Sequence, residues 1–258
     1  MTLAHADTIA GLVKGLAVLE SFDTERQRLN ATQAAQRAGL TRAAARRHLL
    51  TLAHLGYLET DGSFFWLGAR ALRLAGAYLA SSRLPRVIQP ALNRLAAATQ
   101  DVYSAVVLDG DEVVIIARSA GLGAAGTRLL AYGMHLGARM PAHATSTGRV
   151  LLAALPDAER AAWLARHEAL PRLTPHTVTQ PRAFREVLDT VRRQDWCLAS
   201  QEHEVGVHAL AVPLRDLQGH TIAALNMIAS PQRVDLDAMR QQMLPLLQDA
   251  ARELRSLL

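Results

Sequence analysis

The strongest constraint on this chain is a 30-residue stretch, 29–58, that reads LNATQAAQRAGLTRAAARRHLLTLAHLGYL. Its first part, 31–38, has helical composition and ends at Gly39, which readily adopts the left-handed conformation that closes a helix. Thr41 then predicts the start of a second helix, because its hydroxyl can accept a hydrogen bond from a first-turn N–H. Two short helices around a tight turn are the layout of a helix-turn-helix, so the stretch predicts a DNA-binding element.

The predicted second helix, 42–55, has two unlike faces. Apolar residues at a helical period predict a further helix at 8–22. Ala45, Leu49 and Leu52 share one side of the 42–55 helix, so we expect them to pack on the helices at 8–22 and 31–38. The other side carries arginines, which bind guanine edges and phosphates. The residues expected to contact DNA are Thr41, Arg42, Ala43, Arg46, Arg47 and Ser63. An arginine-bearing helical pair that contacts protein is the alternative interpretation.

A hairpin is expected directly after this helix. Residues 57–60 and 63–67 have strand character and flank Asp61-Gly62, a dipeptide typical of tight hairpin turns. A hairpin in that place is a wing, and Ser63 near its tip is expected to meet the DNA backbone or minor groove. The net charge of +5 is modest, but four arginines fall within the eleven residues 37–47, which contain no acid. Such a focused basic patch is what phosphate contact requires.

The remainder of the chain predicts a different kind of domain. We expect a winged helix-turn-helix domain at 1–68, a linker helix at 69–83, and an effector-binding and oligomerisation domain at 84–258. The last part contains strand patterns at 102–108, 112–118, 196–200, 209–214 and 220–228, extended segments at 129–136 and 139–144, and helices at 84–99, 146–155, 157–165, 181–193 and 236–258. Antiparallel strands interrupted by helices predict an α+β fold around a central sheet.

One segment of this second domain predicts a ligand site. Residues 143–149, HATSTGR, lead into the N-terminus of an apolar helix. A helix N-terminus offers free N–H groups and partial positive charge, which suit a small carboxylate. Thr145 or Ser146 as a simple helix cap, His143 as a buried hydrogen-bonding residue, and Arg149 as the partner of an acid across the fold are alternatives that the residues leave open.

Metal and enzyme functions are poorly supported. Glu202, His203, His208 and Cys197 have the right chemistry for metal ligands, but their spacing matches no established zinc pattern. The chain has no nucleophile elbow, P-loop or paired catalytic carboxylates. GLGAAG at 121–126 has dinucleotide-loop spacing without a surrounding βαβ unit, so we interpret it as a loop. We expect neither enzymatic activity nor a cofactor or metal. A purely architectural DNA-binding protein is disfavoured by the large, nearly neutral second domain.

The expected location is the cytoplasm. No apolar run approaches the roughly 18 residues that span a bilayer, so no membrane partner is expected. The N-terminus lacks the pattern of a secretory signal. Cys197 is the single cysteine and cannot form an internal disulfide, which is consistent with a reducing compartment.

Three blocks together resemble the IclR family of bacterial transcriptional regulators. They are the winged helix-turn-helix, LGARMPAHATSTGRVLLAALP at 136–156 and QEHEVGVHALAVPLRD at 201–216, and they cover nearly the whole chain in the family's order. The resemblance implies a GAF-like effector domain and homodimers or homotetramers that bind palindromic double-stranded DNA. Three segments, GLAVLESFD, LTRAAARRHLLTLAHLGYL and TSTGRVLLAALP, are most similar to regulators of p-hydroxybenzoate and protocatechuate catabolism, the β-ketoadipate branch.

The resemblance also implies an effector pocket. The candidate effector-binding residues are Leu129, Tyr132, His143, Thr145, Ser146, Thr147, Arg149, Glu202, Val207, His208, Ala209, Asn226 and Ile228. Four of them, Tyr132, Glu202, His208 and Asn226, are candidates to hydrogen-bond a ring hydroxyl. The implied function is a regulator of a catabolic operon that responds to a small aromatic carboxylate such as p-hydroxybenzoate or protocatechuate. The alternative is a repressor that senses another small organic acid, a keto acid or a ring-cleavage product.

The chain departs from the family's second signature at three positions. Asp195 stands where glycine is usual, Ala199 where Asp or Ser is usual, and Arg215 where an aromatic is usual. A carboxylate at the Ala199 position lines the pocket in one branch of the family, so its loss argues against that branch's small keto acids. Arg149 replaces a frequent lysine and preserves the positive charge.

Overall fold

The computed structural model describes residues 7–23, 26–119 and 135–258, and its contacts divide the chain into two units, Met1–Ser81 and Ser82–Leu258. The division falls inside the expected linker, 69–83. The loop expected at 121–126, the first six residues of the extended segment expected at 129–136, and the candidate residues Leu129 and Tyr132 lie outside the described residues.

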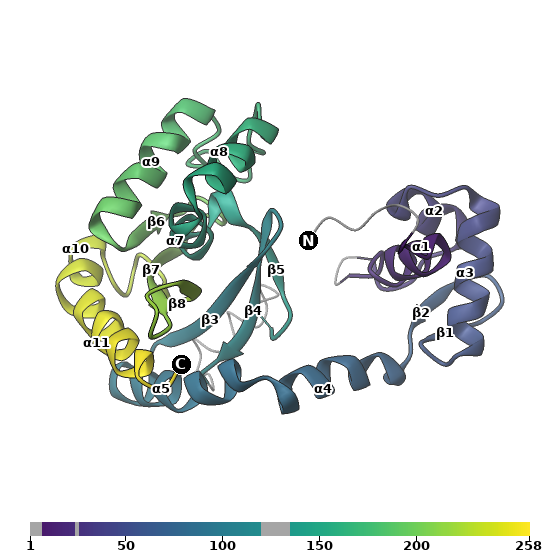
Figure 1. The fold of residues 1–258 in the computed structure, drawn as a ribbon, viewed down its shortest axis with the longest axis horizontal. Helices are drawn as coiled ribbons and strands as arrows, with labels where there is room; N and C mark the ends of the chain where they lie inside the picture. The colour runs from purple at the N-terminus through teal and green to yellow at the C-terminus, as the bar shows by residue number, and fades with distance from the viewer. Residues whose placement is uncertain (1–6, 24–25, 120–134) are drawn as a thin grey trace. The chain divides into compact units, whose positions relative to one another are not determined.

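In its described residues, the first unit has three helices and a small hairpin, followed by a fourth helix, α4 (Figure 1). Its elements are α1 Ala10–Leu19, α2 Ala31–Ala38, α3 Arg42–His54, β1 Leu58–Thr60, β2 Phe65–Leu67, a short 3₁₀ turn at Ala69–Ala71, and α4 Leu72–Ser81. Asn30 and Gln33 form a reciprocal capping box at the start of α2, and Gly39 ends it with φ +64°. The Thr41 hydroxyl accepts a hydrogen bond from the Ala44 N–H at 3.2 Å, which confirms its predicted role as the cap of α3.

The core of the first unit confirms the predicted inner face of α3. Ala45 and Leu49 are fully buried and Leu52 is partly buried, all in one cluster with residues of the other two helices and the hairpin. The apolar residues along one side of α1, by contrast, are not buried in this core. Ile9, Leu12, Val13 and Leu16 are exposed, from 46% to 72% of their surface.

The hairpin differs from the predicted one at its turn. Thr60 pairs with Phe65, so four residues, 61–64, connect the strands instead of the expected Asp61-Gly62 alone. The Asp61 carboxylate accepts hydrogen bonds from the N–H groups of Ser63 and Phe64, at 3.0 and 2.8 Å, and thereby shapes the longer turn. Ser63, expected at the start of the second strand, therefore lies in the turn itself.

The second unit is built on a six-stranded antiparallel sheet in the order β5-β4-β3-β8-β7-β6. The strands are β3 Val102–Asp109, β4 Glu112–Arg118, β5 Arg139–Pro141, β6 Cys197–Ser200, β7 His208–Arg215 and β8 Thr221–Ala229. The helices are α5 Arg83–Thr99, α7 Ser146–Ala154, α8 Asp157–Arg166, α9 Pro181–Gln194, α10 Leu236–Ala238 and α11 Leu244–Arg255, with a wider π-helical segment at Met239–Met243 and a 3₁₀ turn at Ala142–Ala144. The predicted α+β class is confirmed.

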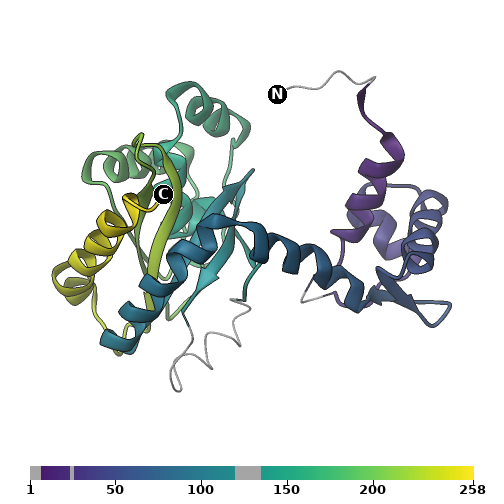
Figure 2. The same cartoon turned by 60° about the horizontal axis from the view of Figure 1, so that its bottom comes forward.

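Helices cover both faces of the sheet (Figures 1 and 2). One core joins α5 and α11 to residues such as Leu210 and Val212 of β7. The other joins α7, α8 and α9 to Ala211 of the same strand, as expected from the alternation of side chains along a strand. Among the helices that the structure describes, none is long and apolar enough to cross a membrane.

Two expected segments are corrected. Of the stretch 139–144, expected to be extended, only Arg139–Pro141 pairs with a neighbouring strand, and Ala142–Ala144 form the 3₁₀ turn that enters α7. The closing helix, expected as one piece over 236–258, is interrupted by the π-helical segment before Pro245. Proline lacks an N–H and cannot continue an α-helical hydrogen-bond ladder, which accounts for the irregular turn there.

Candidate DNA-binding helix and effector pocket

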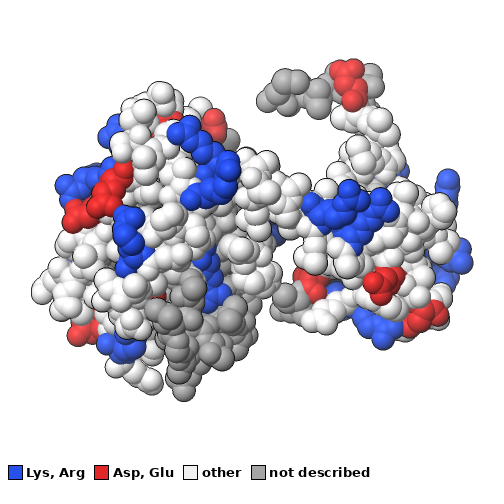
Figure 3. Space-filling view, turned by 90° about the horizontal axis from the view of Figure 1, so that it is seen from below, with Lys and Arg blue, Asp and Glu red and all other residues white. Residues whose placement is uncertain are grey.

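The outer face of α3 is a free basic surface. Arg42, Ala43, Arg46 and Arg47 are all exposed, opposite the buried side of the helix. Within the described residues the structure records no ion pair for the three arginines, so their guanidinium groups stay available to an anion. Figure 3 shows basic side chains in groups on the surface of this unit.

Two neighbouring arginines are already engaged. Arg37, which the sequence places in the same basic stretch, pairs with Asp23. Arg28 pairs with Asp61 of the turn at 2.5 Å, and its guanidinium carbon lies 4.5 Å from the centre of the Trp66 ring. Sequence reasoning missed Arg28 because its contact with the wing depends on the folding of a polar loop over the hairpin.

The second unit contains a cavity at the N-terminal end of α7. Its volume is about 40 Å³, enough for about three water molecules. Eight of the residues predicted from the sequence line it: Thr145, Ser146, Thr147, Glu202, Val207, Ala209, Asn226 and Ile228. The remaining lining residues are Ser104, Ile115, Met140, Ala144, Ala199, His203 and Glu204.

The first turn of α7 supplies the polar end of the cavity. The Thr145 hydroxyl accepts a hydrogen bond from the Gly148 N–H at 3.1 Å, so Thr145 is the helix cap. Ser146 follows it and is 1% exposed, and the structure gives its hydroxyl no hydrogen-bond partner among the described residues. A buried hydroxyl without a partner is costly, and Ser146 lines the cavity, so its hydroxyl is a candidate hydrogen-bond donor to a ligand.

Gly148 allows this turn to sit close to the preceding segment. A Cβ at that position would overlap the backbone of Ala142, which cannot move aside as a flexible side chain does. We expect Gly148→Ala to lower the free energy of unfolding by about 1–3 kcal/mol, the usual cost of overpacking. Urea unfolding checks this, with Gly76→Ala in the exposed helix α4 as control, because nothing lies near a Cβ there. A cost no larger than the control's would contradict the close packing.

The opposite side of the cavity holds a buried amide. Asn226 on β8 is 8% exposed and lies directly across from Ser104 of β3 in the register. The Ser104 hydroxyl donates to the Asn226 Oδ1 at 2.5 Å. The neighbouring strand thus supplies one of the hydrogen-bond partners that a buried amide requires. Asn226 is a second polar group of the cavity lining, besides Ser146.

Arg149 and Glu202 form a buried ion pair. Arg149 is 2% exposed, and its two terminal nitrogens donate to the two carboxylate oxygens of Glu202 while its Nε donates to the His143 carbonyl. Glu202 also accepts a hydrogen bond from the Val178 N–H at 3.1 Å. The sequence left open whether Arg149 contacts a ligand or pairs with an acid elsewhere in the fold. In the structure it pairs with an acid, Glu202. Arg149 does not line the cavity and its guanidinium is engaged by Glu202, so a direct contact between Arg149 and an effector stays a prediction.

Two histidines predicted as effector-binding residues, His143 and His208, do not line the cavity. His143 Nε2 lies 2.9 Å from the Pro171 carbonyl, and burial lowers the pKa of this imidazole below its ordinary value, so it stays neutral near pH 7. His208 precedes the pocket residue Ala209, and adjacent residues of a strand point to opposite faces. Neither histidine lines the cavity in the described part of the chain.

Ser104, His203 and Glu204 are the polar lining residues that sequence reasoning missed. Ser104 becomes visible only when β3 is paired with β8, which lies 122 residues further on. His203 was considered as a metal ligand only. Within the described residues no group of three His, Cys, Asp or Glu side chains could hold a metal ion. Burial raises the pKa of the Cys197 thiol to about 11, which disfavours the thiolate that a metal would need.

Two of the family departures are explained together. Asp195 ends α9 in the left-handed conformation, φ +67°, which is the conformation that glycine favours. Its carboxylate binds the Arg215 guanidinium through two hydrogen bonds of 2.5 and 2.6 Å. The two unusual residues are therefore partners in one ion pair.

An exposed arginine helix with a wing, followed by a sheet domain with a cavity of polar and apolar lining, is the arrangement of a DNA-binding protein with a small-molecule sensor domain. The sequence profile of the IclR helix-turn-helix domain matches residues 11–62, and that of the bacterial transcriptional regulator IclR C-terminal domain matches 76–256. The chain therefore belongs to the IclR family of bacterial transcriptional regulators.

Relatives within the family are close. The p-hydroxybenzoate hydroxylase transcriptional activator of Acinetobacter baylyi is 52% identical over 97% of this chain and 92% of its own length. The Pca operon regulatory protein of the same organism is 49% identical over 99% of this chain and 91% of its own. A crystal structure of the inducer-binding domain of an Acinetobacter PobR double mutant with 3-hydroxybenzoic acid is 49% identical over 69% of this chain and all of that domain, with a TM-score of 0.64.

Proposed function

We propose that this protein regulates a catabolic operon for hydroxylated aromatic acids and that its effector is a small aromatic carboxylate such as p-hydroxybenzoate or protocatechuate. The observation that carries the effector class is the unpartnered Ser146 hydroxyl at the N-terminal end of α7, facing a cavity with apolar walls. The p-hydroxybenzoate and Pca regulators named above support the class of operon. The chain's role is then that of a cytoplasmic regulator without enzymatic activity, and activation is the proposed sign of regulation.

The proposed division of labour follows the chain. Residues 1–68 bind DNA, 69–83 link the domains, and 84–258 bind effector and oligomerise. The N-terminal half of α3 enters the major groove, where Arg42, Arg46 and Arg47 contact guanine edges or phosphates. Ala43 allows close approach of the backbone to the bases, and Thr41 and Ser63 contact the DNA backbone.

A palindromic operator and a homodimer are part of the proposal. One winged helix makes too few base contacts for operator-level affinity, so two copies are needed. The exposed apolar residues of α1, from Ile9 to Leu16, and Leu72, Leu74 and Tyr78 of α4 offer surface for a second copy. Exposed apolar side chains at helical spacing mark an interaction surface when they are contiguous. Two dimers would assemble into a tetramer through the effector domains.

In the effector pocket, the carboxylate would accept hydrogen bonds from Ser146, Thr147 and the first-turn N–H groups of α7. Asn226 and Ser104 would bind a ring hydroxyl, and Ala209 and Ile228 would pack against the ring. A hydroxybenzoate occupies more space than a cavity of about 40 Å³ offers. Binding must therefore displace part of the wall, which gives the ligand a means of shifting the domain between two states.

A thermal-shift titration tests the effector class. The ligands are p-hydroxybenzoate, protocatechuate, β-ketoadipate, cis,cis-muconate, glyoxylate and pyruvate. A ligand at 100 times its Kd stabilises the folded state by about 2.7 kcal/mol, a readily measured shift. We expect a selective shift with an aromatic acid. A shift with a keto acid or a ring-cleavage product alone would support the alternative, a regulator of that other ligand acting as repressor.

Ser146→Ala is expected to weaken effector binding about tenfold, because it removes a hydrogen bond to a charged ligand. Isothermal titration with p-hydroxybenzoate measures the change. Thr190→Ala serves as the matched control, since it removes an exposed hydroxyl that bonds only within α9. DNA affinity without effector should be unchanged in both variants. An unaltered Kd for Ser146→Ala would remove this residue from the site.

A further inference from the structure

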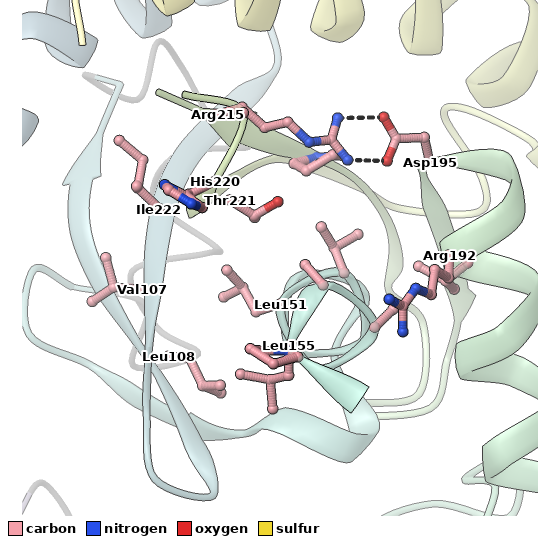
Figure 4. Close-up of a pocket in the computed structure, with 17 residues that line it drawn as sticks. Val107, Leu108, Leu151, Leu155, Arg192, Asp195, Arg215, His220, Thr221 and Ile222 are labelled. Carbon is pink, nitrogen blue, oxygen red and sulfur yellow. Dashed lines mark hydrogen bonds and ion pairs between the residues drawn. The ribbon is translucent and has the colours of Figure 1, made fainter. Parts of the chain in front are cut away.

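A second, larger cavity lies at the other end of α7 (Figure 4). Its volume of about 520 Å³ falls in the range of small-molecule sites, about 300–1,000 Å³. Figure 4 shows apolar side chains on two sides, Val107 and Leu108 from β3 and Leu151 and Leu155 from α7 and its end. Ile222 of β8 adds a further apolar wall. Neither the proposed effector site nor the proposed DNA contacts involve this cavity.

The ionisable side chains of this cavity are mostly basic. Arg192, Arg215 and His220 line it, against a single acid, Asp195. Arg215 is held by two hydrogen bonds to Asp195, which leaves the rest of its five N–H donors available. Arg192 is paired with Asp157, which does not line the cavity. An apolar hollow with a preoriented guanidinium at one edge matches a small carboxylate with an apolar body.

The two cavities are built from the same elements. On β3 the effector pocket uses Ser104 and the second cavity uses Leu108, four residues on, or about 13 Å along a strand. Helix α7 has its first turn in the effector pocket and its last in the second cavity, and Ser146–Ala153 are all buried. Strands β7 and β8 line both as well. A shift of the buried helix therefore alters both cavities, which is the physical link that coupling requires.

We propose that this second cavity is an accessory site for a small carboxylate with an apolar body, and that its occupancy changes the affinity of the effector pocket. The coupling rests on the proposed function of that pocket; the binding itself does not. By linkage, each ligand changes the affinity of the other by the same factor.

Isoleucine methyl groups can report the two cavities separately in the full-length protein. Ile222 lines the second cavity, and Ile115 and Ile228 line the effector pocket. The experiment follows the δ1 methyl signals by NMR during titration with benzoate, with Ile222 assigned through Ile222→Val. We expect the Ile222 signal to shift and saturate. Benzyl alcohol, which lacks the carboxylate, should move it less, and Arg215→Gln should remove the difference between the two probes.

Two tryptophan variants provide the matched comparison. Ala154 is exposed and lines the second cavity, so Ala154→Trp fills it; Ala158 is exposed on α8 and lines neither cavity. Ala154→Trp should weaken the benzoate response of Ile222 at least tenfold and change the p-hydroxybenzoate Kd, read at Ile228, about fivefold or more. Ala158→Trp should change neither.

Three outcomes overturn the proposal: benzoate shifts only Ile115 and Ile228; the Ile222 shift does not saturate; or Ile222 responds to protein concentration alone, which identifies the occupant as a second copy. An unchanged p-hydroxybenzoate Kd in Ala154→Trp overturns the coupling. Failure of the proposed function has a separate signature, since p-hydroxybenzoate would then leave Ile115 and Ile228 unmoved.

Discussion

Arg149→Met is expected to lower the free energy of unfolding by about 3–5 kcal/mol, because it leaves the Glu202 carboxylate buried without its partner. For a protein of this size that loss lowers Tm by roughly 10 °C. The pair is almost wholly removed from solvent, with side-chain exposures of 2% and 10%. Urea unfolding followed by circular dichroism gives the free energy, and differential scanning calorimetry gives Tm.

The control for this change is Arg94→Met. Arg94 pairs with Glu253 at 2.7 Å, but both side chains are 64% exposed, and exposed pairs contribute about 0–1 kcal/mol. A second control removes both buried charges, since Arg149→Met combined with Glu202→Met should recover much of the loss. If Arg149→Met costs no more than Arg94→Met, the buried pair contributes no more to stability than an exposed one.

Local sequence signals predicted the first unit well because its elements are specified by neighbours in the chain. Gly39 and Thr41 act within one turn of the helices that they close and open, so the bounds of α2 and the start of α3 followed from the residues. The length of the turn in the wing could not be predicted in this way. Asp-Gly favours a two-residue turn, but the Asp61 carboxylate bonds to two N–H groups beyond it and stabilises a four-residue connection.

The candidate effector pocket was only partly predictable because its chemistry depends on contacts between distant residues. The motif at 143–149 located the α7 end of the cavity from a local property, the free donors of a helix N-terminus. The same motif could not show whether Arg149 meets a ligand or Glu202, 53 residues away. Likewise, no local sequence pattern indicated that Ser104 lines the cavity, because its position depends on the pairing of β3 with β8.

Arg46→Ala combined with Arg47→Ala is expected to reduce operator affinity at least about 100-fold, because arginine contacts to guanine are worth about 1–3 kcal/mol each. Both side chains are exposed on α3. The helix should persist, since alanine is its best former. Fluorescence anisotropy with DNA selected from random sequences by the unaltered protein measures the change. The salt dependence of binding should also become shallower if either arginine contacts phosphate.

The comparison variant Arg182→Ala combined with Arg185→Ala removes the same charge from exposed positions on α9 in the other unit. A loss of affinity caused by net charge alone would appear equally in both double variants, because long-range attraction to DNA depends on total charge. A loss confined to the α3 variant assigns the effect to contact at the recognition surface. Effector binding should stay intact in both, since the pocket lies wholly in the second unit. Loss of DNA and effector binding together in the α3 variant would mean that the substitution had unfolded the protein, and unaltered DNA binding would remove α3 from the interface.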